Sequence, residues 1–495
     1  MPLLHPALTA GLILGYVGLQ VAVGVWIGRR VRSSADYYLA GRSLGTFPVA
    51  MSVFATWFGA ETVLGSSAVI ASEGLAGARA EPFGYALCLT AMAFLVAAPF
   101  RSRGYTTLAD FFRERFSRGT EIAAAVITML VSVIWAAAQL LAFSAILSVA
   151  FGLPGIVTLI AAAVIVIVYA AFGGLLSDVA TDVVQGIILL AALLGVLVAL
   201  AFALDGLNGL LGVIEPEQLR LVGPGESVLA RLDAWSIPIL GSLVTQEAIA
   251  RFAGAKSVRV ARNGCLGAAG LYLLAGAAPV LIALAGVHHA PLPAEADQFL
   301  PMLVSDLLGP FWSVLLMAAL LSALLSTVDS NILSVSALAT TNLANFRKKR
   351  SRGSGDDAVG EDPGSLWAAR AATVAAGLTA LAIAIATLAA GDVIYDLIEL
   401  SSTLGQAGLL VAVLAGLHFR FGGRGACWAA ILACAGCNLF TYVAYPLLIG
   451  HADAELPGGF LLSVLAAAAA YGLAGLFERP YSAGSAPTSP PSPAS

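Results

Sequence analysis

The chain has 495 residues, of which 59% are hydrophobic and 11% are charged, and its mean hydropathy is +0.91. Soluble globular domains carry about 25% charged residues, so the composition excludes an ordinary soluble domain and favours a polytopic helical membrane protein. The formal net charge of −4 gives no reason to expect a nucleic-acid partner, and the five cysteines, all in or beside apolar segments, form no disulfide framework.

Apolar runs along the chain predict an all-α protein with thirteen membrane-spanning helices. The first run has no basic n-region and no small-residue cleavage site, so we expect a spanning helix and not a signal peptide. In chain order the predicted spans are 7–27, 46–72, 81–99, 120–150, 155–172, 180–205, 235–252, 262–287, 310–343, 366–390, 392–418, 425–450 and 458–478.

Basic residues give a test of this count, because loops on the cytoplasmic side are enriched in Lys and Arg. With thirteen spans and the N-terminus outside, all of them except Arg79, Arg220 and Arg231 fall at inner loops, Arg251 among them. The sequence therefore predicts a multi-pass protein of the plasma (inner) membrane with a cytoplasmic C-terminus.

Three of the predicted spans are unusually polar, and polar groups persist in lipid mainly where they line a cavity. The first contains SVFATWFGAETVLGSS (52–67), in which Gly59 and Gly65 flank Glu61. The second contains WSIPILGSLVTQE (235–247), which Pro238 and Gly241 interrupt. Interrupted segments at corresponding places in two halves of a chain point to the binding site of a transporter.

These two segments begin two halves of five spans each, and an odd number of spans gives the halves opposite orientations. The resulting division is 1–45 as an extra helix and loop, 46–205 as the first repeat, 206–234 as an outer loop, 235–418 as the second repeat, 419–478 as two further helices, and 479–495 as a disordered tail.

The third polar span contains SALLSTVDSNILSVS (322–336). At 100° per residue Ser322, Ser326 and Ser330 share one line, with Thr327 and Asp329 on its flanks. Oxygen ligands with little total charge suit a hard monovalent cation, and no His/Cys cluster accompanies them to favour a transition metal.

Four motifs resemble the sodium:solute symporter family, whose fold is a leucine-transporter-like five-plus-five inverted repeat with broken first helices. They are DYYLAGRSLG (36–45), FATWFGAETVLG (54–65), GGLLSDVATDVVQ (173–185) and LLSTVDSNIL (324–333). Within the family, three stretches are similar to the high-affinity choline transporter branch: RSRGYTTLADFF (101–112), VIWAAAQLLAFSAILS (133–148) and STVDSNILSVSAL (326–338).

The resemblance implies two cation sites, with sodium as the coupling ion and no organic cofactor. The ligands of the first, common sodium site are the carbonyls of Ala55, Phe58 and Ala323 and the hydroxyls of Ser326 and Thr327. The second site, present in some members, matches Asp182, Ser326 and Ser330, with Asp329 where those members have serine.

The substrate that the resemblance implies is a small polar solute, an organic cation such as choline included. Three positions of the aromatic box that holds choline are matched by Trp57, Tyr85 and Trp135, whereas the fourth position is Thr245. Glu61 and Thr62 match positions that contact substrate hydroxyls in sodium–sugar members. Each aromatic residue also has an interpretation as ordinary packing.

Other functions remain open at this point. Proton-coupled symport is an alternative, because Asp182, Asp329 and Glu61 are titratable. A membrane sensor is less favoured, since no kinase domain follows the last span. No enzyme is expected, because H-E-x-x-H, G-x-S-x-G and the motifs of membrane aspartyl proteases are absent from the sequence. The expected partners are a small-molecule substrate and the lipid bilayer.

Overall fold

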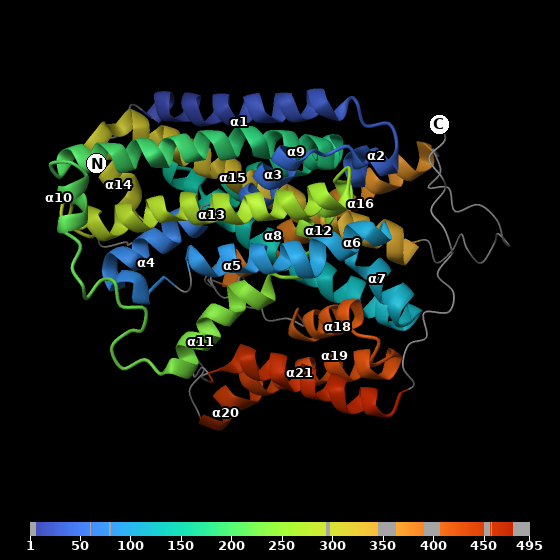
Figure 1. The fold of residues 1–495 in the computed structure, drawn as a ribbon. Coiled ribbons are helices and arrows are strands. Elements are labelled where there is room, and N and C mark those ends of the chain that lie inside the picture. Colours follow the sequence, from blue (N-terminus) through green and yellow to red (C-terminus); the bar gives the residue numbers. More distant parts are fainter. Residues whose placement is uncertain are drawn as a thin grey trace.

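A computed structural model describes residues 6–59, 61–78, 81–293, 298–344, 363–390, 406–449, 456 and 458–478, with the side chains of 6–10, Glu61, 149–150 and 363–365 outside this set. Nearly all of these residues are helical, and most long helices run along one direction of the molecule (Figure 1). The one β-bridge among the described residues joins Leu44 to Ala255.

The long helices account for the predicted spans. They are α1 (Pro6–Gly28), α3 (Thr46–Trp57) with α4 (Ser66–Glu73), α5 (Phe83–Met92) with α6 (Ala98–Arg103), α8 (Arg118–Phe151), α9 (Gly155–Ala203), α11 (Val228–Ser236) with α12 (Gln246–Gly254), α13 (Val258–Gly286), α15 (Pro310–Leu338), α16 (Pro363–Ala390), α18 (Gln406–His418), α19 (Arg424–Leu439) with α20 (Tyr445–Ile449), and α21 (Gly459–Leu476).

Short elements connect or extend these helices. The connecting helices are α2 (Ser34–Leu39), α7 (Leu108–Arg115), α10 (Leu207–Gly212) and α14 (Phe299–Leu308). Single 3₁₀ or π turns are η1 (Ala40–Arg42), η2 (Glu61–Gly65), η3 (Gly74–Ala76), η4 (Ala93–Ala97), η5 (Ile237–Gly241), η7 (Ala339–Leu343) and η9 (Phe440–Ala444).

Helix α9 contains two of the predicted spans. At Gly174 the backbone takes φ 60° and ψ −176°, which is not helical. The hydroxyls of Tyr169 and Thr181 are nevertheless in hydrogen-bond contact, whereas a straight helix places residues twelve apart about 18 Å from each other. The chain therefore reverses at Gly174, where a Cβ would lie 2.8 Å from the ring of Tyr37. This turn separates the predicted spans 155–172 and 180–205.

The described residues contain ten helices long and apolar enough to cross a membrane, or eleven with the bent pair Thr46–Trp57 and Thr62–Ala76. The second half of α9 and the shorter α18 account for the two remaining predicted spans, although residues 392–405 lie outside the described part. The loop 345–362 and the tail 479–495 also lie outside it. Within the predicted outer loop 206–234, the structure has the short helix α10 and most of α11.

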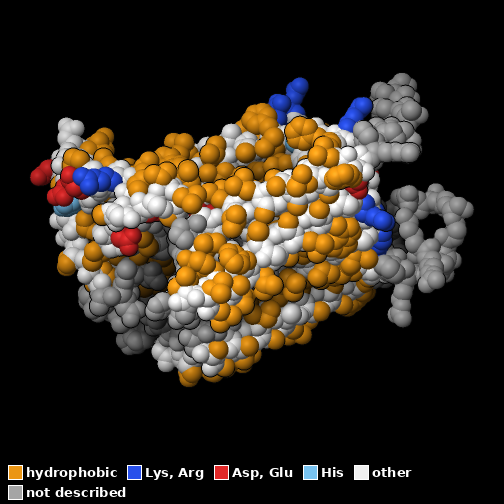
Figure 2. All heavy atoms as spheres, turned by 90° about the horizontal axis from the view of Figure 1, so that it is seen from below, with side chains coloured by type: hydrophobic (Ala, Val, Ile, Leu, Met, Phe, Trp, Pro, Cys, Tyr) orange, Lys and Arg blue, Asp and Glu red, His pale blue; other side chains and the backbone are white. Residues whose placement is uncertain are grey.

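The surface supports a membrane setting for these helices. Charged side chains gather at the two ends of the bundle, and the face between them is largely apolar (Figure 2). Helix α15, by contrast, is enclosed by other helices, since every residue from Ala318 to Leu338 is buried. The polar stripe of α15 therefore faces protein on all sides.

Candidate functional site

The first interrupted helix ends where the sequence predicts a break. The amide of Gly59, which would bond the Ala55 carbonyl in a continuous helix, instead donates to the Trp57 carbonyl at 3.1 Å. The paired axes of Thr46–Trp57 and Thr62–Ala76 differ by 62°. The end of α3 thus frees backbone carbonyl oxygens in the middle of the bundle, at the negative end of the helix dipole.

Helix α15 brings hydroxyls to this break. The Thr327 hydroxyl lies 3.1 Å from the Ala323 carbonyl oxygen and 3.3 Å from the Thr56 carbonyl oxygen. Ala323 and Ala55 are both buried. This juxtaposition of carbonyls with a hydroxyl suits a monovalent cation.

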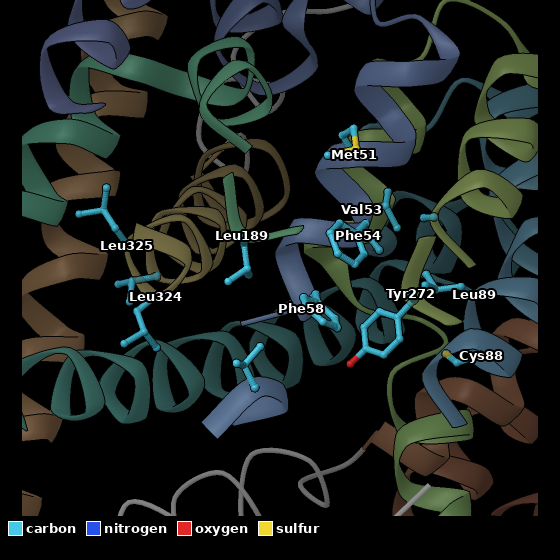
Figure 3. Packing of buried hydrophobic residues seen from close by; sticks show 14 of the residues in the cluster. Met51, Val53, Phe54, Phe58, Cys88, Leu89, Leu189, Tyr272, Leu324 and Leu325 are labelled. Atoms are coloured by element: carbon cyan, nitrogen blue, oxygen red, sulfur yellow. The ribbon is translucent and has the colours of Figure 1, made fainter. Parts of the chain in front are cut away.

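Aromatic packing fixes the end of α3. The Phe58 ring stacks on Phe54 with centroids 4.7 Å apart and meets the Tyr272 ring edge-on at 5.3 Å. Figure 3 shows Phe54 of α3 and Phe58 just after its end, with Tyr272 of α13 beside them. The Phe58 side chain is fully buried, so its backbone is held in place by the core.

Two of the residues predicted for the second cation site, Asp182 and Ser330, lie in a buried ionic cluster around Arg251. Nη2 of Arg251 is 2.7 Å from Asp178 Oδ2 and 3.3 Å from Asp182 Oδ2. It also donates to the Ser330 hydroxyl at 2.7 Å. The guanidinium is therefore the cation that the structure places at Asp182.

Serines complete the cluster. The hydroxyls of Ser52 and Ser326 each donate to a different oxygen of Asp182. Ser326, predicted as a ligand of the first sodium site, thus links that site to the cluster. The sequence assigned Arg251 to an inner loop, which is wrong: it is 1% exposed and lies within α12. Because the span was predicted to end at residue 252, Arg251 was counted with the basic residues of the loop that follows.

Asp329 lies at the edge of this cluster. Its side chain is fully buried, and Oδ1 has no hydrogen-bond partner among the described residues. Burial of a charged carboxylate oxygen without a partner costs free energy. A bound cation or a bound proton would lower that cost at Asp329.

A central cavity joins the two interrupted helices. Five of the six predicted substrate residues line it: Trp57, Thr62, Tyr85, Trp135 and Thr245. The sixth, Glu61, begins η2 beyond the break, and its side chain lies outside the described residues. The cavity volume is about 70 Å³, several times the ~10–15 Å³ that one enclosed water needs, so it suits a small solute.

The cavity has an aromatic wall. The rings of Trp57 and Tyr85 are 5.8 Å apart between centroids, and Trp135 of α8 also lines the cavity. Thr62 forms part of its boundary, but its hydroxyl is also engaged outside the cavity, 3.0 Å from the Tyr272 hydroxyl and 3.2 Å from Glu81 Oε1.

Glu247 is a cavity residue that the sequence analysis did not identify. It lies in the first turn of α12, two residues after Thr245, and is the one acidic residue among the described residues that line the cavity. The remaining polar lining comes from hydroxyl and amide side chains: Thr56, Thr128, Ser132, Gln139, Ser242, Gln246, Thr327, Asn331 and Gln406. The signal was present, because Glu247 closes the interrupted stretch WSIPILGSLVTQE.

Two interrupted helices around a buried polar cavity define a secondary transporter. The model of the sodium:solute symporter family matches residues 37–433, so the chain belongs to this family. Members of this family are transporters and not enzymes.

Comparisons with individual proteins agree. The chain is 30% identical over 428 residues to the high-affinity choline transporter 1 of Drosophila melanogaster, covering 83% of this chain and 66% of that protein. It is 27% identical over 421 residues to the Homo sapiens high affinity choline transporter 1, covering 79% and 69% respectively. The chain thus spans about two thirds of the length of these relatives.

Solved structures show the fold. A Na+-coupled sialic acid symporter in an outward-open state matches with a TM-score of 0.80 at 17% identity, over 96% of this chain and 98% of that one. A nucleobase-cation-symport-1 family transporter in a closed conformation matches with a TM-score of 0.59 at 14% identity, over 88% and 93%. The leucine-transporter-like fold with broken first helices, predicted from the sequence, is confirmed.

Proposed function

We propose that the protein is a sodium-coupled symporter that moves a small organic cation, with choline as the first candidate, by alternating access. One observation carries the proposal: an aromatic wall of Trp57, Tyr85 and Trp135 lines a cavity that also reaches the break in α3. A cation over such rings gains about 0.5–2 kcal/mol per ring. The choline transporters named above support choline as the first compound to test.

Sodium is proposed to bind where α3 and α15 meet. The ligands would be the carbonyls of Ala55, Phe58 and Ala323 with the hydroxyls of Ser326 and Thr327. Thr327 also lines the cavity, so one side chain belongs to both sites. Because sodium would hold α15 against the broken end of α3, its binding would preorganise the cavity for the solute.

A proton-coupled symporter is the second candidate. The specific observation in its favour is the buried Oδ1 of Asp329, which has no hydrogen-bond partner among the described residues and whose negative charge a proton would neutralise. In the first candidate, the second cation site comprises Asp182, Asp329 and Ser330. Arg251 already balances part of the charge there, so a second sodium would bind beside Asp329.

The orientation is also part of the proposal. The distribution of Lys and Arg supports an outer N-terminus and a cytoplasmic C-terminus, with repeats 46–205 and 235–418 in opposite orientations. Labelling of a cysteine placed within 345–362 only from the outside of intact cells would reverse this assignment.

Uptake into proteoliposomes tests the function. Radiolabelled choline should accumulate under an inward sodium gradient and not under a potassium gradient of equal size. Accumulation driven by a pH gradient without sodium would favour the second candidate. A lack of choline-dependent stabilisation in sodium, measured as a thermal shift, would remove choline as the substrate.

A further inference from the structure

The cavity has two unlike walls. Aromatic rings come from α3, α5 and α8, whereas the second interrupted helix contributes Thr245 and Glu247. Thr245 stands where the resemblance to choline transporters implies a fourth ring. This protein therefore has one ring fewer and, two residues further on, a carboxylate.

The carboxylate of Glu247 forms no ion pair with a basic side chain of the described residues. Arg251, one turn away, uses Nη1 to bond the Glu247 backbone carbonyl at 2.9 Å and Nη2 to pair with Asp178 and Asp182. Among the described residues no Lys, Arg or His side chain lies within ion-pair distance of the Glu247 carboxylate or lines the cavity.

Its surroundings orient this carboxylate and leave it able to bind. The Glu247 side chain lies beside those of Trp57 and Thr245, and it occupies the first turn of α12, where the helix dipole stabilises negative charge. A carboxylate has about four lone-pair positions. The backbone amide of Glu247, the indole N–H and the hydroxyl occupy at most three of them, so at least one acceptor position remains for a solute.

We propose that Glu247 makes the cavity selective for organic cations that carry N–H groups, such as protonated primary and secondary amines, over quaternary ammonium ions. The inference rests on the proposed function and narrows its substrate class. An ammonium N–H donates a short charge-assisted hydrogen bond to a carboxylate. A quaternary ammonium has no N–H and depends on its aromatic cage, which here lacks a ring at Thr245.

A series of amines that differ in methylation measures this selectivity directly. Ethanolamine, N-methylethanolamine, N,N-dimethylethanolamine and choline keep the same hydroxyl and the same charge at neutral pH, while the number of N–H groups falls from three to none. Affinity is measured by thermal shift and by competition for uptake, with sodium present. We expect ethanolamine to bind about tenfold more tightly than choline, the equivalent of one charge-assisted hydrogen bond.

Three variants test whether Glu247 causes this selectivity. Glu247→Gln keeps the shape and removes the charge, so it should lower ethanolamine affinity about tenfold or more while changing choline affinity severalfold less. Glu217→Gln is the matched control, since that carboxylate is 65% exposed and outside the cavity, and it should leave the series unchanged. Glu247→Asp, which keeps the charge, should retain the order of the series if Glu247→Gln fails to fold.

The outcomes separate the inference from the proposed function. Tightest binding of choline, with the same order in Glu247→Gln, overturns the inference and leaves organic-cation symport intact. Failure of all four amines to bind in sodium overturns both. A descending order from ethanolamine to choline that flattens in Glu247→Gln supports both.

Discussion

The two interrupted helices use opposite ends of a helix. At the first break, α3 ends, and its last carbonyls face α15. At the second break, α12 begins at Gln246 and carries Glu247 in its first turn. The end of a helix carries partial negative charge and its start partial positive charge. In the proposed function, the first break binds sodium through its carbonyls together with hydroxyls of α15, while the second stabilises a carboxylate that attracts a cationic solute.

The breaks are also held in different ways. Apolar ring packing of Phe54, Phe58 and Tyr272 fixes the first (Figure 3). The second is tied by Arg251, whose guanidinium joins α12 to Ser52 of α3, to Asp178 and Asp182 of α9, and to Ser330 of α15. Removal of one partner from a buried ionic cluster leaves another charge unbalanced. A mutation at the second break should therefore cost more stability than one at the first.

Loss of the ionic tie should have the largest effect. Arg251→Met leaves buried carboxylates without their counter-charge, and removal of one partner from a buried pair costs about 3–5 kcal/mol. We expect a large fall in the thermal unfolding midpoint of the purified protein and loss of uptake.

Arg259→Met provides the matched control, because Arg259 is an exposed base near the start of α13 and its replacement should leave the midpoint within a degree or two. Restoration of part of the lost stability in the double variant Arg251→Met, Asp178→Asn would confirm unbalanced charge as the cause. An unchanged midpoint in Arg251→Met would show that the tie is not important for stability.

The next largest effect concerns sodium at the first break. Thr327→Ala removes an oxygen from the proposed cation site, and an interaction of a hydroxyl with a charge contributes about 1.5–3 kcal/mol. The sodium concentration for half-maximal uptake should rise about tenfold or more. Ser326→Ala should raise it as well, whereas Thr327→Ser keeps the oxygen and should behave as the wild type. Unaltered sodium dependence in both alanine variants, with normal expression, would place the ion elsewhere.

The contrast between the breaks explains how much the sequence could predict. Apolar length and glycine or proline interruptions predicted the spans and both breaks, because these features depend on local composition. The polar stripe of α15 was also predicted, from helical periodicity. Glu61 was the one acidic residue predicted to bind the substrate, because of its place in a motif. The structure adds Glu247 on the cavity wall.

The Arg251 cluster could not be predicted in the same way. Its partners Ser52, Asp178 and Ser330 lie on three other helices, and which helices meet is decided by packing. A basic residue near a predicted loop is assigned to the loop by default. The reversal at Gly174 is the exception, since the sequence predicted two separate spans, 155–172 and 180–205, on either side of it.

A smaller effect is expected where the cavity lacks its fourth ring. Thr245→Trp adds an aromatic face to the wall that carries Glu247 and should tighten choline binding by about 2- to 30-fold, since cation–π attraction contributes about 0.5–2 kcal/mol. Trp135→Leu should weaken choline markedly, while Trp312→Leu, on the exposed surface, serves as control. If the protein binds a neutral sugar and no quaternary amine, the rings of Trp57, Tyr85 and Trp135 serve in packing and not in cation binding.

The smallest effect concerns Glu226, which precedes α11 and lies outside the membrane spans. Partial burial alone would raise the pKa of Glu226, but the amide of Gly223 at 2.9 Å and the guanidinium of Arg231 at 2.5 Å lower it overall. A lowered pKa contributes stability above the unfolded-state value, and this stability is lost as pH falls through the folded-state value. Ion pairs at protein surfaces contribute about 0.2–1 kcal/mol. Arg231→Gln should therefore reduce the unfolding midpoint by about a degree at pH 7, and the difference from wild type should shrink as the pH falls below ~4, near the ordinary glutamate pKa. A difference that stays constant down to that pH would assign the effect of Arg231 to packing of α11 and not to its charge.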